Sequence, residues 1–275
     1  MWKTLSESVQ GSLHRRAGKP CQDDCQWNEF RLGQETVLVL LCADGSGSAK
    51  HGGIGARLAC QTLSRLIVGQ LVRLDRLPKI TREMTRAWLQ EVREQLALEA
   101  RGLEAELRDL ASTLLGAVMG EAGAAFFQIG DGAMVVRQGT SYEHVFWPRS
   151  GEYVNVTYFL TDVRFEENLD FSWLDRRIDE ISLFTDGLQR LAMDYRAVRA
   201  HEPFFAPMFA SLRACPDPAQ LKDPLRKLLE SPQVEERTDD DKTLMLATRL
   251  TDDGRLVDDG RLADQGRLAD DGPVF

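Results

Sequence analysis

The chain is predicted to form an α+β fold in which helices pack on a stack of antiparallel sheets. Short apolar runs, typical of buried strands, recur along the sequence. Two long stretches in its first half repeat apolar residues every three or four positions, which is the period of an amphipathic helix. The resulting order is a strand, two helices, a run of strands, further helices and a last strand. A length of 275 residues allows such a fold a large core.

The first half of the chain contains the first strand and the two long helices. The expected elements are a loop at 11–24, a strand at 36–43, a Gly-rich segment at 44–48, and helices at 54–74 and 80–99. Pro78 ends the first helix. The second carries Met84, Trp88, Val92 and Leu96 on one stripe, which indicates core packing. It is expected to continue for a turn or two toward Leu110.

The second half is rich in strands and ends with short helices. Strands are expected at 113–119, 123–129, 133–137, 143–147, 154–158, 181–184 and 243–248. Helices are expected to begin near 187–195 and to cover 208–215 and 224–230. Residues 138–141 contain Gly139 and are typical of a hairpin connection.

From Arg249 the sequence repeats every six residues, each unit containing one Leu and at least one Asp. Four such units are too short to bury a solenoid core. The chain is therefore divided into one domain over residues 1–248 and an acidic tail over 249–275, which is predicted to be disordered. The alternative, an Asp-rich Ca²⁺ repeat, lacks the glycine spacing of such repeats.

Charge and cysteine content exclude several classes of protein. The net charge of −9 leaves no basic surplus to neutralise nucleic-acid phosphates. No signal peptide and no membrane-spanning run are expected, since no apolar stretch is long enough. The five cysteines, an odd number, favour reduced thiols and a cytoplasmic location. Cys21 and Cys25 are four apart, but no second Cys/His pair at zinc spacing accompanies them.

Three apolar runs stop at the dipeptide Asp-Gly, and these dipeptides begin at Asp44, Asp131 and Asp186. A further acidic cluster, residues 239–241, precedes the last expected strand. Carboxylates at strand ends can gather at one rim of a sheet, where their oxygens bind Mg²⁺ or Mn²⁺. The alternative for any single pair is a tight turn, because Asp-Gly is also a strong hairpin signal. The interpretation therefore depends on the complete set and its order.

The ordered motifs resemble the PP2C (PPM) family of metal-dependent Ser/Thr protein phosphatases in its compact bacterial form. The matching segments are Gly11-Ser12-Leu13-His14, Pro20-Cys21-Gln22-Asp23-Asp24, Ala43-Asp44-Gly45-Ser46-Gly47-Ser48, Ser112-Thr113, Gly130-Asp131-Gly132, Phe184-Thr185-Asp186-Gly187-Leu188 and Asp240-Asp241-Lys242-Thr243. The resemblance runs from about Gly11 to Thr248. It implies an α-β-β-α layered sandwich of antiparallel sheets flanked by helices, with two Mn²⁺ or Mg²⁺ ions at one end.

The resemblance also implies a role for each acidic position. Asp44 would bridge both metals and the Gly45 carbonyl would bind one of them. Asp186 and Asp240 would bind the other. Asp23 would hold metal-bound water, and Asp131 with Asp186 resembles the pair that holds a third, weaker metal. Two such ions activate a bridging water for in-line attack at phosphorus, so no covalent nucleophile is needed.

Two positions depart from the family pattern. The eukaryotic pattern has His two residues after the bridging Asp, as a proposed general acid, and this chain has Ser46; His51 is a weaker candidate for that role. The family's phosphate-binding Arg falls at Gly18. The candidates for that role are His14, Arg15 and Arg16, and an arginine is favoured because its fork binds two phosphate oxygens.

The predicted function is hydrolysis of phosphoserine and phosphothreonine in proteins by a metal-activated water. The expected partner is a phosphorylated protein, either the target or the autophosphorylated form of a Ser/Thr kinase, with neither nucleic acid nor membrane involved. One alternative is a phosphatase-like module that binds phosphoproteins without turnover; unneutralised carboxylates at one site would repel one another, which disfavours it. Another is a phosphatase of a small phosphoester, since loops determine the substrate groove.

Overall fold

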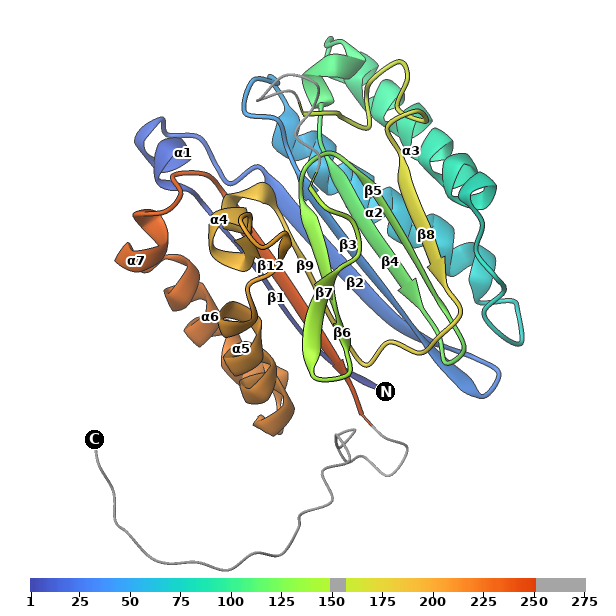
Figure 1. Ribbon diagram of the computed structural model, residues 1–275. Coiled ribbons are helices and arrows are strands. Elements are labelled where there is room, and N and C mark those ends of the chain that lie inside the picture. Colours follow the sequence, from blue (N-terminus) through green and yellow to red (C-terminus); the bar gives the residue numbers. More distant parts are fainter. Residues whose placement is uncertain (149–156, 251–275) are drawn as a thin grey trace, which may run out of the picture.

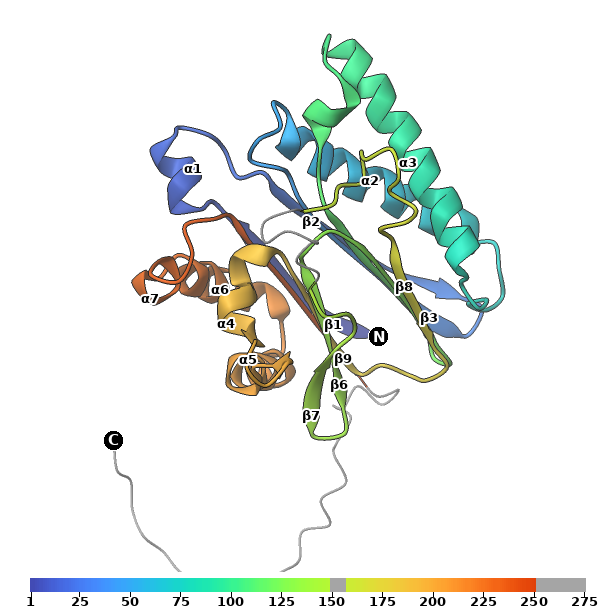
Figure 2. The same ribbon diagram turned by 45° about the horizontal axis from the view of Figure 1, so that its top comes forward.

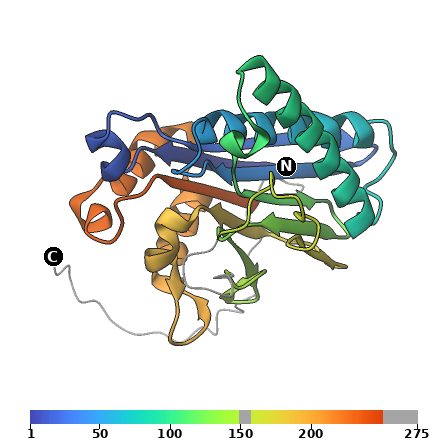
Figure 3. The same cartoon turned by 90° about the horizontal axis from the view of Figure 1, so that it is seen from above.

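The computed structural model describes residues 1–148 and 157–250. Two five-stranded antiparallel sheets pack face to face, and helices cover the outer face of each sheet (Figure 1). The view from above shows the four layers in the order helix, sheet, sheet, helix (Figure 3). The predicted α-β-β-α sandwich is therefore confirmed. Within the described residues, no helix is long and apolar enough to cross a membrane.

The first sheet is ordered β2-β3-β4-β5-β8. Its strands are β2 (Asp23–Leu32), β3 (Glu35–Asp44), β4 (Leu114–Met119), β5 (Ala124–Ile129) and β8 (Asp170–Leu174). The interior strand β3 is buried on both faces: Val37, Val39 and Leu41 face the helices, whereas Leu38 and Leu40 face the other sheet. This two-sided burial explains why its sequence is an unbroken apolar run.

The second sheet is ordered β1-β12-β9-β6-β7. Its strands are β1 (Trp2–Val9), β12 (Lys242–Arg249), β9 (Glu180–Phe184), β6 (Ala133–Gln138) and β7 (Ser141–His144), with a separate two-stranded ribbon of β10 (Met193–Asp194) and β11 (Arg199–Ala200). Strand β12 lies between β1 and β9 and is also buried on both faces. Its Leu244 and Leu246 contact the helical side, and Met245 and Ala247 contact the core between the sheets.

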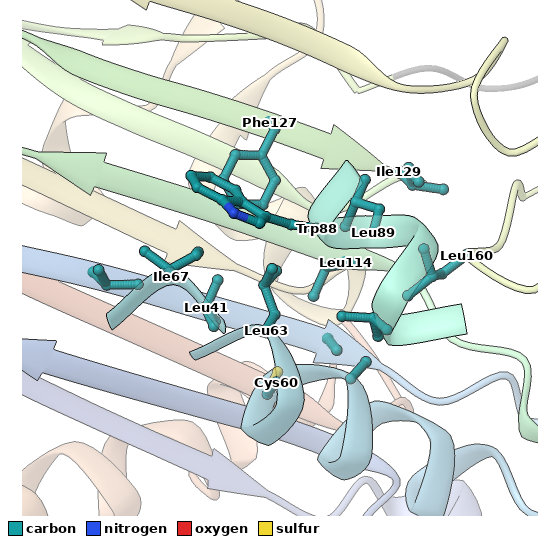
Figure 4. Packing of buried hydrophobic residues seen from close by; sticks show 14 of the residues in the cluster. Leu41, Cys60, Leu63, Ile67, Trp88, Leu89, Leu114, Phe127, Ile129 and Leu160 are labelled. Carbon is teal, nitrogen blue, oxygen red and sulfur yellow. The ribbon is translucent and has the colours of Figure 1, made fainter. Parts of the chain in front are cut away.

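Two long helices cover the first sheet, α2 (Gly52–Leu71) and α3 (Arg82–Gly102). Buried residues on α2 recur at three- and four-residue spacing and pack with Trp88 and Leu89 of α3 against the sheet (Figure 4). The indole Nε1 of Trp88 donates a hydrogen bond to Gln70 Oε1 at 2.6 Å, which satisfies its only polar atom in the core. Thr81 caps α3 by accepting a hydrogen bond from the Met84 amide at 3.2 Å.

The second sheet is covered by shorter helices. These are α4 (Gln189–Ala192), α5 (Glu202–Ala214), α6 (Lys222–Leu229) and α7 (Pro232–Glu235), with the 3₁₀ turns η2 (Asp186–Leu188) and η3 (Pro218–Leu221). Another short helix, α1 (Ser12–Arg16), lies at the same end of the molecule as α4 and α7 (Figure 2). Loops from both sheets meet at this end.

Several expected elements were wrong or incomplete. The segment 11–24, expected as a loop, contains α1 and the first residues of β2. Strands β1, β2 and β8 were missed, since their residues are partly polar: each lies at the edge of its sheet and is only partly buried. The helix expected to continue toward Leu110 instead ends at Gly102, where Glu104 adopts a φ of 53°, and a 3₁₀ turn, η1 (Leu107–Leu110), follows.

The short helices also differ from expectation. Only α4 is helical within 187–195, and α5 begins six residues earlier than expected, at Glu202, with Pro203 in its first turn. A proline is accepted there because first-turn amides have no helical partner. The strand expected at 154–158 lies mostly outside the described residues, as does the acidic tail after residue 250.

Candidate metal centre

Asp23 and Asp44 lie opposite each other where β2 begins and β3 ends. Both main-chain polar groups of Asp44 are held by Thr113: the Asp44 amide donates to Thr113 Oγ1 at 3.0 Å, and the Thr113 amide donates to the Asp44 carbonyl at 2.8 Å. The next residue must be glycine, because a Cβ on Gly45 would stand 2.4 Å from the carbonyl carbon of Gly52. The antiparallel register therefore places two carboxylates side by side.

Asp23 also connects the first sheet to the second. Its Oδ2 accepts hydrogen bonds from the hydroxyls of Thr185 and Thr243, each at 2.8 Å. Thr185 directly precedes Asp186, and Thr243 lies three residues after Asp240. One buried carboxylate oxygen thus fixes the segments that carry two further predicted metal ligands.

The turn around Asp131 is held by side-chain amides. Gln128 is buried, and its Nε2 donates to the carbonyls of Gly130 at 3.0 Å and of Gly132 at 2.8 Å. Thr157 Oγ1 donates to Asp131 Oδ2 at 2.6 Å, and Gln189 Nε2 donates to the Asp131 carbonyl. Asp131 therefore occupies a tight turn between β5 and β6, as the turn alternative expected, and this turn faces the Asp186 loop.

Asp240 and Asp241 differ in burial and contacts. Asp241 is 2% exposed, and its carboxylate accepts three hydrogen bonds: from the Gly11 amide and the Gln22 amide at 2.6 Å each, and from His14 Nδ1 at 2.7 Å. Asp240 is partly exposed, and its Oδ1 accepts the Asp241 amide at 2.8 Å. Asp241 thus fastens α1 and the start of β2 to the loop before β12.

Sequence reasoning assigned no role to Asp241. A run of three aspartates does not show which one points inward. Two glycines indicate that the backbone approaches this run closely. A Cβ on Gly11 would lie 2.2 Å from the carbonyl carbon of Asp240, and a Cβ on Gly187 would lie 2.0 Å from the Asp241 carbonyl oxygen. Close backbone approach of this kind requires glycine.

The carboxylates raise one another's pKa. Burial is the largest cause that raises the pKa of Asp44 well above its ordinary value, and the charges of Asp23, Asp186 and Asp240 add to it. Burial also raises the pKa of Asp186 to about 8, with the charge of Asp131 as the next cause. For Asp23, burial raises the pKa to about 7, although the two threonine hydroxyls oppose the increase. The predicted ligands therefore form one electrostatically coupled group.

The buried oxygens of this group fit a divalent cation. Within the described part of the chain, Oδ1 of Asp23 and Oδ1 of Asp186 are buried without a hydrogen-bond partner. Over the same residues, no three His, Cys, Asp or Glu side chains form a closed group that would hold a metal by themselves. Hard cations such as Mg²⁺ keep several waters and need few direct carboxylates. The donor set thus fits hydrated ions bound by single carboxylates and a carbonyl.

The predicted cations on α1 lie in different surroundings. Arg15 Nη2 donates to Glu235 Oε1 at 2.7 Å, and Arg16 lies 3.7 Å from the Asp239 carboxylate; both side chains are exposed. His14 is buried, and its Nε2 lies 3.8 Å from the position of a Cβ on Gly47, in the loop after Asp44.

The positions that depart from the family pattern carry no evident replacement group. The Ser46 hydroxyl shares a hydrogen bond with that of Ser48 at 2.9 Å. Gly18 adopts a φ of +66° with open space around it. The amide of His51 donates to the Asp109 carbonyl at 2.7 Å just before α2 begins.

A two-sheet sandwich with neighbouring carboxylates at one end is the arrangement that the PP2C resemblance implies. The chain belongs to the protein phosphatase 2C family, whose sequence model matches residues 10–230. It is also 37% identical over 253 residues to Serine/threonine-protein phosphatase 3 of Escherichia coli (strain K12), covering 90% of this chain and 98% of that protein. The resemblance noted in the sequence is confirmed.

Solved structures share the fold. The Ser/Thr phosphatase Stp1 from Staphylococcus aureus matches with a TM-score of 0.57 and 16% identity, over 91% of this chain and 96% of that one. The catalytic domain of the Ser/Thr phosphatase PstP, in complex with two manganese ions, matches with a TM-score of 0.57 and 15% identity, over 90% and 97% of the two chains. At such identities the likeness concerns the fold alone.

Proposed function

We propose that this protein is a phosphoprotein phosphatase of the protein phosphatase 2C type, which hydrolyses phosphoserine and phosphothreonine with a metal-activated water. The observation that carries the proposal is the coupled carboxylate group at one end of both sheets. Its members have raised pKa values, and two of its buried oxygens lack partners among the described residues. Family membership and the relative from Escherichia coli support the same reaction.

In this proposal each residue has a distinct task. Asp44 would be a ligand of both Mn²⁺ or Mg²⁺ ions, and the Gly45 carbonyl would bind one of them. Asp186 and Asp240 would bind the other, and Asp131 with Asp186 would hold a third, weaker ion. Bound there, the ions supply a nucleophilic water at neutral pH and neutralise phosphate charge. Asp23, whose Oδ2 is already committed to two threonines, keeps Oδ1 free to orient a water.

The proposal is tested by metal-dependent hydrolysis of an aryl phosphate and of a phosphothreonine peptide, measured side by side. With Mn²⁺ both should be hydrolysed, and excess EDTA should abolish both activities because the attacking water is no longer activated. Full turnover after verified metal removal would exclude the two-metal reaction. Hydrolysis of the aryl phosphate with no measurable action on any phosphopeptide would instead point to a small phosphoester as substrate.

A separate test on α1 asks which side chain binds the phosphate of the substrate. We expect His14→Ala to lower kcat/KM for a phosphopeptide at least about tenfold, because His14 is buried and fixed by Asp241. Arg15→Ala and Arg16→Ala should change it less than about threefold, since both side chains are exposed and face carboxylates. If an arginine variant raises KM strongly while His14→Ala behaves as wild type, the role belongs to that arginine.

The partner and location follow from the proposed reaction. The substrate would be a phosphorylated protein, either the target or the autophosphorylated form of a Ser/Thr kinase. A cytoplasmic location is proposed because all five cysteines are free, and Cys42 and Cys60 are buried in the core as thiols. The domain boundary at residue 248 stays a prediction.

A further inference from the structure

A small pocket lies beside the carboxylate group. Its volume is about 180 Å³, and it is lined by Asp186, Gly187, Arg190, Arg237, Thr238, Asp239 and Asp240. This is about six times the roughly 30 Å³ share of one liquid water, yet below the roughly 300 Å³ at which whole-ligand pockets begin. The pocket therefore suits a single polar group of a larger ligand. Asp44 is not among the lining residues, so the pocket lies next to the proposed reaction centre.

Two arginines enter this pocket from different elements. Arg190 is on α4, four residues after η2 begins, and Arg237 follows α7 in the loop that leads to β12. Figures 1 and 2 both place α4 and α7 at the end where α1 lies. Burial raises the pKa of Tyr195 and the charges of Asp186 and Asp131 add to this increase, whereas the charge of Arg190 opposes it. Arg190 is thus close to the rim of the carboxylate group.

Neither guanidinium has a polar partner among the residues that the structure describes. In residues 1–148 and 157–250 the side chains of Arg190 and Arg237 form no hydrogen bond or ion pair, although Asp186 and Asp240 line the same pocket. Other arginines at this end do have partners, such as Arg15 with Glu235. A guanidinium next to carboxylates that it does not contact retains its donors for a ligand. Its planar fork suits the paired oxygens of a carboxylate or phosphate.

We propose that Arg190 and Arg237 form a subsite for a second anionic group of the phosphoprotein, a carboxylate or phosphate close to the residue being dephosphorylated. This inference rests on the proposed function, because Asp186 and Asp240 must be neutralised by metal before an anion is favoured there. The third carboxylate, Asp239, faces Arg16 at 3.7 Å. The subsite selects substrates with acidic surroundings, and the uncharged part of the peptide remains outside this pocket.

The test uses four phosphothreonine peptides that differ only in the flanking residues, which are Glu, a non-hydrolysable phosphonate analogue of phosphoserine, Gln or Lys. Wild-type protein with Mn²⁺ should show kcat/KM about tenfold higher for each anionic peptide than for the Gln peptide. The double variant Arg190→Gln/Arg237→Gln should reduce this preference to less than about twofold, with aryl phosphate hydrolysis unchanged. Charge reversal, Arg190→Glu/Arg237→Glu, should favour a Lys-flanked peptide.

Binding gives a readout that is independent of turnover. Fluorescence anisotropy with phosphonate analogues of the same peptides should show the same order of Kd, and the double variant should lose it. Arg73→Gln is the matched control, an exposed arginine beyond the far end of α2, roughly 30 Å from its start. The proposal is overturned if wild type does not distinguish the flanks, or if the double variant keeps the preference. Absence of hydrolysis with binding preference intact would overturn only the proposed function.

Discussion

Asp44→Asn is expected to lower phosphatase turnover by at least about a thousandfold without unfolding the protein. Asp44 is the proposed shared ligand of both ions, and an amide supplies one neutral oxygen in place of two charged ones. Its backbone position does not depend on the side chain, because Thr113 holds both its amide and its carbonyl. The variant should therefore retain its circular dichroism spectrum while calorimetry shows loss of Mn²⁺ binding.

The same substitution should stabilise the metal-free protein at neutral pH. Burial and neighbouring charges raise the pKa of Asp44 in the folded state, so the folded protein binds a proton that the unfolded chain releases. Stability from such a group is complete below its unfolded pKa, near 4, and is lost as pH rises through the folded value. Asn carries no charge to bury. The Tm of the EDTA-treated variant should therefore fall less between pH 5 and pH 8 than the Tm of EDTA-treated wild type.

Asp75→Asn serves as the control for both measurements, since Asp75 is exposed in the connection between α2 and α3. It should match wild type in turnover, metal binding and the pH dependence of Tm. If Asp44→Asn binds two ions and works at the wild-type rate, Asp44 is a turn residue and the bridging assignment fails.

The fold could be predicted where burial requires a recognisable pattern of apolar residues in the sequence. Strands β3 and β12 are buried on both faces and therefore appear as continuous apolar runs. The edge strands β1, β2 and β8 carry no such pattern, because one side contacts solvent, and they were missed for this reason. Helix α1 was missed too, since five residues with one apolar side chain have no readable period. Its position depends on a tertiary contact, the Leu13 amide bonded to the Asp239 carbonyl at 2.9 Å.

The sequence could predict which acidic residues lie close together, but not the hydrogen bonds that connect them to the rest of the fold. Asp-Gly at strand ends placed Asp44, Asp131 and Asp186 on neighbouring loops, and the structure shows that their charges interact. Sequence order gave no means to see that Asp23 accepts hydrogen bonds from the hydroxyls of Thr185, which follows β9, and of Thr243 on β12. Such contacts depend on the register between strands distant in sequence. The role of Asp241 was hidden for the same reason.

Asp241→Ala is expected to lower the free energy of unfolding by about 3–5 kcal/mol. The carboxylate is 2% exposed and accepts hydrogen bonds from two main-chain amides and from His14. Alanine would leave three buried donors unpaired, each at a cost of about 1–3 kcal/mol, reduced where water enters the space. Urea denaturation in EDTA measures the loss without any contribution from metal binding. Asp239→Ala, on the same loop but exposed, should change stability by less than about 0.5 kcal/mol.

His14→Ala separates the two roles of this contact, holding the loops and orienting the imidazole. It removes one of the three hydrogen bonds and leaves the Gly11 and Gln22 amides paired, so its loss of stability should be smaller than that of Asp241→Ala. The double variant should lose less than the sum of the two single losses, because the two side chains share one contact. A urea midpoint of Asp241→Ala equal to that of wild type would show that this carboxylate does not hold α1 in place. Loss of activity in that variant would then have to come from His14 or Asp240 alone.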